Sequence, residues 1–312
     1  MDNGAKFPRK DTKIVQCETL EEVMANEYDP EIMNLLVEAG ADVNCLIQDK
    51  YSLLSSLYYI KSPKVAMKML DKLLELGIDV NLKIGKDEER PAIDHLLEVG
   101  LSLDLLKKVV EAGADINAPD KNGERPLTYA AVFAKDVKII KYLVEKGAKL
   151  SVNTGETPNL LADAAARNQS LQFIKDLIEY CRGLSYSNDL IFDAFMQATY
   201  NNNPEVIKAF KGKFNFKTAD DIIISYGSCL LNSPRPYKCV GYLNEIGLDI
   251  NTQNENGTTV LHMVARYEDK PVRMINILLD HGADETLRNK KGYTYYDMYE
   301  LRKQCLKKND DK

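Results

Sequence analysis

Long apolar runs are missing from this sequence of 312 residues. A membrane-spanning helix needs roughly 18 consecutive apolar residues, and the longest candidate, 221–226, is short and stops at polar residues. The amino-terminal residues 1–6 have no apolar stretch behind a positive start, which argues against a secretory signal. These absences predict a cytoplasmic protein that does not engage a membrane.

Residues that usually carry out chemistry are few and scattered. The three histidines, His95, His262 and His281, have no cysteine or second histidine close to them in the sequence. Neither of the glycine-rich phosphate-loop patterns occurs. The segment 226–229, Tyr-Gly-Ser-Cys, lacks the second glycine of a nucleophile elbow. We therefore predict no catalytic residue, no metal, no cofactor and no enzymatic activity.

Cysteine and charge are also distributed without a pattern that indicates a site. The six cysteines are widely and irregularly spaced with no C-x-x-C pair, so we interpret them as small buried apolar residues rather than as disulfides or ligands. The formal charge is −6 and the basic residues are dispersed among acidic ones, which argues against a nucleic-acid partner. We expect the chain to be a monomer.

What the sequence does contain is a repeated phrase. LLVEAGADVN at 35–44 returns as LLELGIDVN at 73–81 and VVEAGADIN at 109–117, with further copies at 143–151, 177–185, 243–251 and 278–286. Its glycine recurs at an interval of about 35 residues. The step from Gly183 to Gly247 is a double one, and Gly212 is the candidate for the displaced glycine between them. The period predicts about seven to eight units.

Each part of the phrase has a mechanical reason. The apolar pairs before the glycine have helical spacing, and the glycine supplies the positive φ that ends a helix. The Asp-aliphatic-Asn that follows predicts an extended segment and a turn. Ser62-Pro63, Asn203-Pro204 and Asp29-Pro30 each place a capping side chain before a proline, which predicts the start of a second helix. Thr19 with Glu22 fits a capping box, so a first helix should begin there.

This pattern resembles the ankyrin-repeat family, whose first helix opens with T-P-L-H-x-A-A. The best match is at 117–131, and 257–265 follows. The resemblance implies an all-α solenoid of helix-turn-helix units with short β-hairpin loops and a concave inner face. It covers 19–300, with degenerate units at 185–240, between a flexible segment at 1–18 and a charged tail at 301–312.

The resemblance also implies where a partner binds, because this family binds through positions that the fold does not constrain, on hairpin tips and late in first helices. We predict contacts from these positions: Tyr51, Tyr59, Lys121, Asn122, Glu124, Val132, Phe133, Glu255, Arg266, Tyr267, Lys290 and Tyr293. Ile60 and Lys291 fall on equivalent positions. Several of these side chains are bulky and apolar, as at interface hot spots, although packing against a neighbouring hairpin would also account for them.

The predicted function is a scaffold or adaptor that holds one or more partner proteins. The abundance of Lys, Asn, Ile and Tyr suggests an AT-rich genome, as in large viruses and intracellular bacteria, so an effector delivered into a host cytoplasm is an open alternative. A second alternative is an enzyme with a cryptic active site in the divergent residues 185–240, docked by the repeats. Binding of nucleic acid or lipid is a third.

Overall fold

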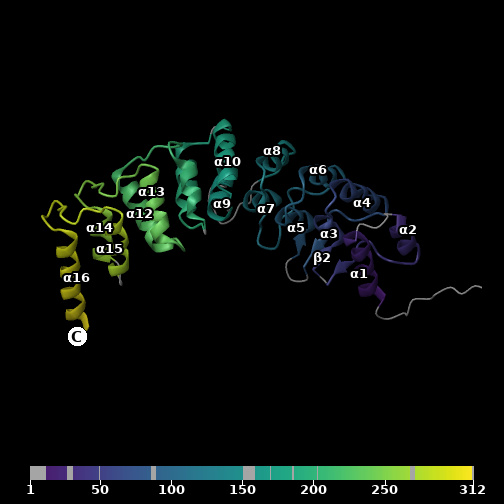
Figure 1. The fold of residues 1–312 in the computed structure, drawn as a ribbon, viewed down its shortest axis with the longest axis horizontal. Coiled ribbons are helices and arrows are strands. Elements are labelled where there is room, and N and C mark those ends of the chain that lie inside the picture. The colour runs from purple at the N-terminus through teal and green to yellow at the C-terminus, as the bar shows by residue number, and fades with distance from the viewer. Residues whose placement is uncertain are drawn as a thin grey trace, which may run out of the picture. The chain divides into compact units, whose positions relative to one another are not determined.

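In the computed structural model the regular structure is mostly α-helical, with short hairpins between helix pairs (Figure 1). It describes residues 12–26, 31–48, 50–85, 89–149, 159–168, 170–184, 186–201, 203–267 and 271–310, with backbone alone at 12–16, 267 and 305–310. The chain divides into two compact units, Met1–Leu160 and Leu161–Lys312, which are called here the N-terminal unit and the C-terminal unit.

The N-terminal unit repeats one motif of two helices and a hairpin. In chain order its elements are α1 (Thr12–Ala25), α2 (Glu31–Glu38), β1 (Leu46–Ile47), β2 (Tyr51–Ser52), α3 (Leu53–Ser56), the 3-10 helix η1 (Leu57–Tyr59), α4 (Pro63–Glu75), β3 (Lys83–Ile84), β4 (Arg90–Pro91), α5 (Ala92–Val99), α6 (Leu103–Glu111), α7 (Pro126–Phe133) and α8 (Val137–Glu145). Strands β1 and β2 pair antiparallel with Ile47 opposite Tyr51, and β3 and β4 with Ile84 opposite Arg90. The first helices α1, α3, α5 and α7 pack each against the next.

The C-terminal unit continues the alternation of helix pairs. Its elements are α9 (Leu160–Arg167), which starts at the boundary residue, α10 (Leu171–Gly183), α11 (Asn188–Ala198), the 3-10 helix η2 (Pro204–Phe210), α12 (Ala219–Asn232), α13 (Pro236–Glu245), α14 (Val260–Tyr267), α15 (Pro271–Asp280) and α16 (Tyr295–Asp310). Here α12 packs against α13 and α14, and α14 packs against α16. The predicted all-α repeat architecture is confirmed. Among the described helices, none has the length and apolar content that crossing a bilayer requires.

The predicted starts of second helices are confirmed where the structure describes them. The Ser62 hydroxyl accepts a hydrogen bond from the Val65 amide, and Pro63 opens α4. Asn203 likewise caps the Glu205 amide at 3.2 Å, but the segment it opens, η2, is a 3-10 helix. The third start, Asp29-Pro30, lies outside the described residues.

One predicted helix start and one predicted glycine conformation are wrong. Helix α1 begins at Thr12, so Thr19 lies in its interior. Cys17 and Leu20 are buried at the spacing of one helix face, and this apolar face starts before the predicted cap. Gly113 ends its helix with a φ of 101°, as the repeated phrase predicts, whereas Gly183 has no positive φ and is the last residue of α10. The candidate for the missing position, Gly212, does take a positive φ of 66°.

An asparagine ladder joins successive hairpins. The Asn81 side-chain amide donates to the Gly113 carbonyl at 3.0 Å, and its oxygen accepts from the Asp115 amide at 2.7 Å. The same pair of bonds is made by Asn44, Asn117 and Asn251 to the following repeat. The recurring asparagine therefore satisfies backbone groups of the next unit, which explains why it accompanies the glycine.

The divergent residues 185–240 replace this signature with an aromatic cluster. Five phenylalanine rings lie with neighbouring centroids between 4.9 and 6.5 Å apart, and they belong to Phe192, Phe195, Phe210, Phe214 and Phe216. Beside them the Asn188 side chain donates to the Asn215 carbonyl at 3.0 Å and accepts from its amide at 2.9 Å. Aromatic packing and one asparagine bridge here hold the chain where the repeated phrase is absent.

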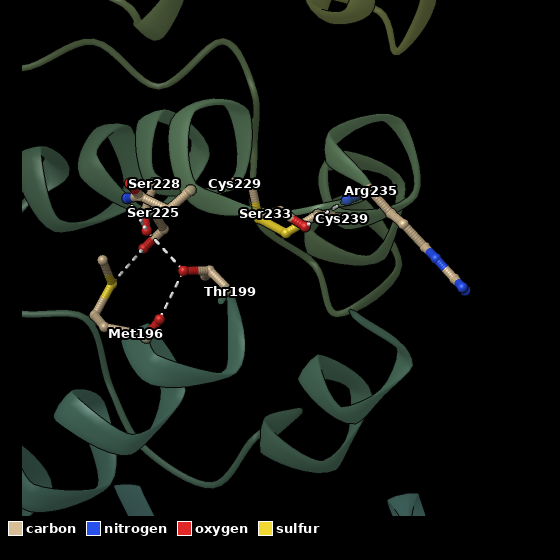
Figure 2. Close-up of a disulfide and its surroundings, with 9 residues drawn as sticks. Met196, Thr199, Ser225, Ser228, Cys229, Ser233, Arg235 and Cys239 are labelled. Atoms are coloured by element: carbon tan, nitrogen blue, oxygen red, sulfur yellow. Dashed lines mark hydrogen bonds between the residues drawn. A yellow bond between two sulfur atoms is a disulfide. The ribbon is translucent and has the colours of Figure 1, made fainter. Parts of the chain in front are cut away.

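The interpretation of the cysteines needs a correction. Cys17 bonds to Cys45 in the N-terminal unit, and Cys229 of α12 bonds to Cys239 of α13 (Figure 2). The Cα atoms lie 5.9 and 5.5 Å apart, within the range that a disulfide spans. Spacing along the sequence did not indicate either pair, because packing of the helix pairs brings them together. Cys181 fits the expectation: it is a buried thiol, and burial raises its pKa to about 12.

Candidate functional site

In each unit, the surface formed by the hairpins and first helices is called here the inner surface of that unit. In the N-terminal unit it includes Tyr51. This tyrosine lies on β2 with 41% of its area exposed, and its ring centroid is 4.8 Å from that of His95 on α5. The His95 Nδ1 atom lies 2.8 Å from the Ser55 hydroxyl. Burial, followed by the Arg90 guanidinium, lowers the pKa of His95. The imidazole is therefore neutral at neutral pH and serves as an apolar support for the tyrosine.

The next part of this surface is organised around Tyr129 of α7. The Arg90 guanidinium lies 4.2 Å over its ring and pairs with the Glu98 carboxylate at 2.6 Å. The Tyr129 hydroxyl donates to Asp120 at 3.0 Å, so the ring is fixed on both sides. Phe133, one helical turn later, stacks on it with a centroid distance of 6.4 Å and an interplanar angle of 18°. The result is a phenylalanine ring that is 39% exposed and packs against the fixed ring of Tyr129.

The structure separates the predicted contacts of the N-terminal unit into exposed and buried ones. Lys121, Asn122 and Tyr59 are exposed, and Glu124 is half-buried. The expectation that the fold leaves Val132 and Ile60 exposed is wrong, because 8% and 7% of their areas are accessible. Val132 lies on the side of α7 that packs into the core, next to the exposed Phe133, whereas Ile60 follows the last residue of η1 in an extended conformation and turns inward.

In the C-terminal unit the inner surface contains a groove of about 800 Å³, called here the C-terminal groove. Helices α12, α14 and α16 and the hairpins around 254–258 and 289–293 provide its walls. Three predicted contacts, Arg266, Lys290 and Tyr293, line it. Glu255 is exposed at the neighbouring hairpin tip, and the Tyr267 side chain lies outside the described residues.

Sequence reasoning missed the apolar side of this groove. Its lining includes Ile223 and Ile224 from α12 and Met298 and Leu301 from α16. No part of the family signature falls on these positions, and α12 belongs to the stretch where that signature is absent. The one available signal was an Ile-Ile-Ile run at 222–224 that is longer than one buried helix face requires.

The two histidines of the C-terminal unit form hydrogen bonds within the fold. His262 is buried, with Nδ1 2.8 Å from the Thr259 hydroxyl and Nε2 2.9 Å from the Tyr293 carbonyl. It thereby ties α14 to the hairpin that follows α15. His281 lies 2.8 Å from the Ile277 carbonyl through Nδ1. Among the residues that the structure describes, no group of three or more His, Cys, Asp or Glu side chains could hold a metal ion.

The segment 226–229, which partly resembles a nucleophile motif, lies inside α12, and its residues pack against neighbouring elements. The Tyr226 hydroxyl donates to the Leu248 carbonyl at 2.9 Å, and a Cβ on Gly227 would stand 2.6 Å from the Met263 methyl group. The Ser228 hydroxyl lies 2.6 Å from that of Thr199, beside the Cys229 disulfide (Figure 2). Every residue of the segment therefore has a packing role that accounts for it.

Comparisons with known proteins match this geometry. A family model of ankyrin repeats in three copies matches residues 97–189, and a single ankyrin repeat matches residues 256–290. An ankyrin repeat protein of Acanthamoeba polyphaga mimivirus is 26% identical over 221 residues, which are 69% of this chain and 26% of that protein. SH3 and multiple ankyrin repeat domains protein 2 of Homo sapiens is 27% identical over 234 residues, 73% of this chain and 12% of that protein.

A third relative is also viral. Ankyrin repeat domain-containing protein M-T5 of Myxoma virus is 31% identical over 123 residues, which are 37% of this chain and 24% of the viral protein. The matched part of the chain thus spans between 12% and 26% of the length of these three relatives. The two family matches lie on either side of residues 190–255, which contain most of the divergent stretch.

Proposed function

Because the chain belongs to the ankyrin-repeat family, we propose that it is a scaffold or adaptor that holds a partner protein on its inner surface and hairpin tips. The observation that carries this proposal is Phe133. Its ring is exposed, yet stacking on Tyr129, which is itself fixed by Arg90 and Asp120, orders it in advance. An ordered aromatic group loses little conformational entropy on binding, which is why such groups become interface anchors.

The proposed role is not enzymatic. The alternative of a cryptic active site needs space in residues 185–240 for a separately folded catalytic block. That stretch instead forms α11, η2 and α12, which pack with α10 and α13 as further helix pairs. The serine and cysteine that a nucleophile would require are engaged inside α12. These contacts favour binding without chemistry, and we propose no nucleic-acid partner and a monomeric chain.

A second candidate function is that of an effector that acts on host proteins. Two of the relatives reported above, from a mimivirus and from Myxoma virus, are viral. We propose that the chain works in a cytoplasm, its own or that of a host. Cytoplasmic thiol systems keep most cysteines reduced, so thiol labelling in intact cells should find both pairs as thiols, with the two disulfides of the structure formed only under oxidising conditions. Protein recovered from cells with Cys229 and Cys239 oxidised would contradict this location.

Affinity capture with quantitative mass spectrometry tests the proposed function. The full chain and a Tyr51→Ala/Phe133→Ala variant are compared on the same lysate, with Leu35→Ala as the matched control. Leu35 is an exposed apolar residue, at 65%, on the second helix α2 and outside the inner surface. We expect one or more proteins to be depleted by the double variant and retained by Leu35→Ala. Capture profiles that the double variant leaves unchanged would refute the inner-surface function.

A further inference from the structure

The floor of the C-terminal groove is apolar and open to solvent. Ile224 and Leu301 are 51% and 43% exposed, and Ile223, Met263 and Met298 continue the same lining. Tyr293 adds a ring that is 39% exposed. Exposed apolar groups scattered singly are ordinary, but a set gathered into one groove marks a surface that another molecule covers.

The rim of this groove has one dominant sign of charge. Arg266, Lys290, Lys291 and Arg302 line it, against a single acidic residue, Asp220. The Asp220 carboxylate accepts a hydrogen bond from the Asn254 side chain at 2.7 Å, so it has a partner within the wall. Within the described part of the chain no carboxylate forms an ion pair with Lys290 or Lys291. A net positive rim in a chain whose formal charge is −6 is a local feature that favours an acidic ligand.

The two lysines are carried by a rigid pair of hairpins. The Lys290 amide donates to the Asn256 carbonyl at 2.9 Å, and the Gln253 side chain donates to the carbonyls of Gly257 and Arg288 at 2.8 and 3.1 Å. Gly257 has a φ of 69°, and a Cβ there would lie 3.0 Å from the backbone nitrogen of Lys290. The hairpins are therefore packed backbone against backbone, which fixes the backbone that carries both lysines before a ligand arrives.

We propose that the C-terminal groove binds an acidic segment of a partner protein whose apolar side chains cover Ile224 and Leu301 while its carboxylates meet the rim. This inference rests on the proposed function and names the partner chemistry for one part of the inner surface. The last residues of this chain do not fit as the occupant, because 303–308 are basic like the rim. Tyr293 is the one aromatic ring of the floor among the described lining residues, whereas single-stranded nucleic acid uses a series of aromatic platforms on which successive bases stack.

Selection from a displayed library of random peptides on the full chain tests this proposal. The selected peptides should be enriched in Asp and Glu next to Leu, Ile, Met or Phe. Their affinities, measured by fluorescence anisotropy, should fall by about tenfold in the charge-reversal variant Lys290→Glu/Lys291→Glu and in Ile224→Ser. Raising the salt concentration should weaken binding to the parent chain and have less effect on the charge-reversal variant.

Matched variants separate the groove from general effects of charge and polarity. Leu231→Ser is the control for Ile224→Ser, because both residues lie on α12 with 51% of their area exposed and Leu231 is outside the groove. Lys211→Glu/Lys238→Glu makes the same change of net charge at exposed positions away from the groove. Both control variants should bind the selected peptides within about twofold of the parent chain.

Several outcomes would overturn the inference. Selected peptides that are basic or without charge bias would do so, as would peptides that the control variants weaken equally. Displacement of the peptides by oligo-dT would point to nucleic acid, and a dimer that the groove variants dissociate would point to a second copy. Peptides that require Phe133 but not the groove would leave the proposed function standing. Failure to select any peptide that depends on either surface would count against both.

Discussion

A single carboxyl group shows how individual residues shape the inner surface of the N-terminal unit. Asp94 of α5 is fully buried, and neither of its oxygens has a hydrogen-bond partner among the described residues. Burial raises its pKa to about 8, while the Arg90 guanidinium acts in the opposite direction. Because Arg90 also orients Tyr129, the charge state of Asp94 bears on the group that holds Phe133.

The raised pKa predicts how stability depends on pH. Between about pH 4 and pH 8 the folded chain keeps the Asp94 proton that the unfolded chain releases, so stability falls as the pH rises through this window. Asp94→Asn removes the ionisable group. We expect its melting temperature to exceed that of the parent chain by an amount that grows from pH 5 to pH 9. Parallel curves of melting temperature against pH would contradict the assignment.

For single residues, the sequence predicted only some of the exposed anchors correctly. Tyr51, Tyr59 and Phe133 are exposed as expected, because the repeat register places them outside the core. Val132 is buried because the register fixes where a helix lies but not which side of it faces the neighbouring helix. No feature of the sequence indicated that Asp94 is buried. A polar residue in the first turn of a helix is common, so the sequence position of Asp94 is ordinary. Only the packing of α5 against α7 shows that this side chain is buried.

Among the elements, the hairpins and helix pairs depend on different kinds of cross-link. Where the phrase is intact, asparagines join neighbouring hairpins, and the glycine and asparagine positions could be predicted from the sequence. In residues 185–240, aromatic packing and a disulfide replace the asparagine bonds, and neither follows a spacing rule in the sequence. The existence of the helix pairs was therefore predictable throughout, whereas what stabilises the divergent ones was not.

The asparagine ladder predicts a matched pair of variants. Asn117→Ala removes the bonds to the Gly147 carbonyl at 3.1 Å and from the Lys149 amide at 2.7 Å. Two partly solvated hydrogen bonds are worth about 1 to 2 kcal/mol, and urea unfolding should show a loss of that size. Asn122→Ala, at an exposed hairpin position outside the ladder, should cost less than about 0.5 kcal/mol. Equal effects would mean that the ladder adds no stability.

The disulfide between α12 and α13 predicts a redox-dependent stability. In a Cys45→Ala variant, only the Cys229–Cys239 disulfide seen in the structure remains. Adding a reductant to this variant should lower the free energy of unfolding by about 2 to 3 kcal/mol, as expected for a short closed loop. The variant Cys45→Ala/Cys229→Ala provides the control, since reductant should leave it unchanged. A urea midpoint that does not respond to reductant in the Cys45→Ala chain would contradict the prediction.

At the scale of the whole molecule, we propose that repeated units of two helices and a hairpin present ordered anchors to a partner protein. Each repeat contributes little by itself, and within one unit the packing of neighbouring repeats sets the spacing between anchors. We propose that exposed residues that the fold does not need carry the recognition. Phe133 is the clearest case, because it is both exposed and held by stacking on Tyr129.

The affinity of a captured partner for Phe133→Ala, measured by calorimetry beside the melting temperature, tests this account most directly. Loss of an interface anchor costs on the order of 2 kcal/mol or more, which weakens binding by at least about thirtyfold. Leu35→Ala should bind like the parent chain, and the melting temperature of both variants should change little. Unchanged affinity together with a large drop in the melting temperature of Phe133→Ala would place the ring in the core and contradict the account.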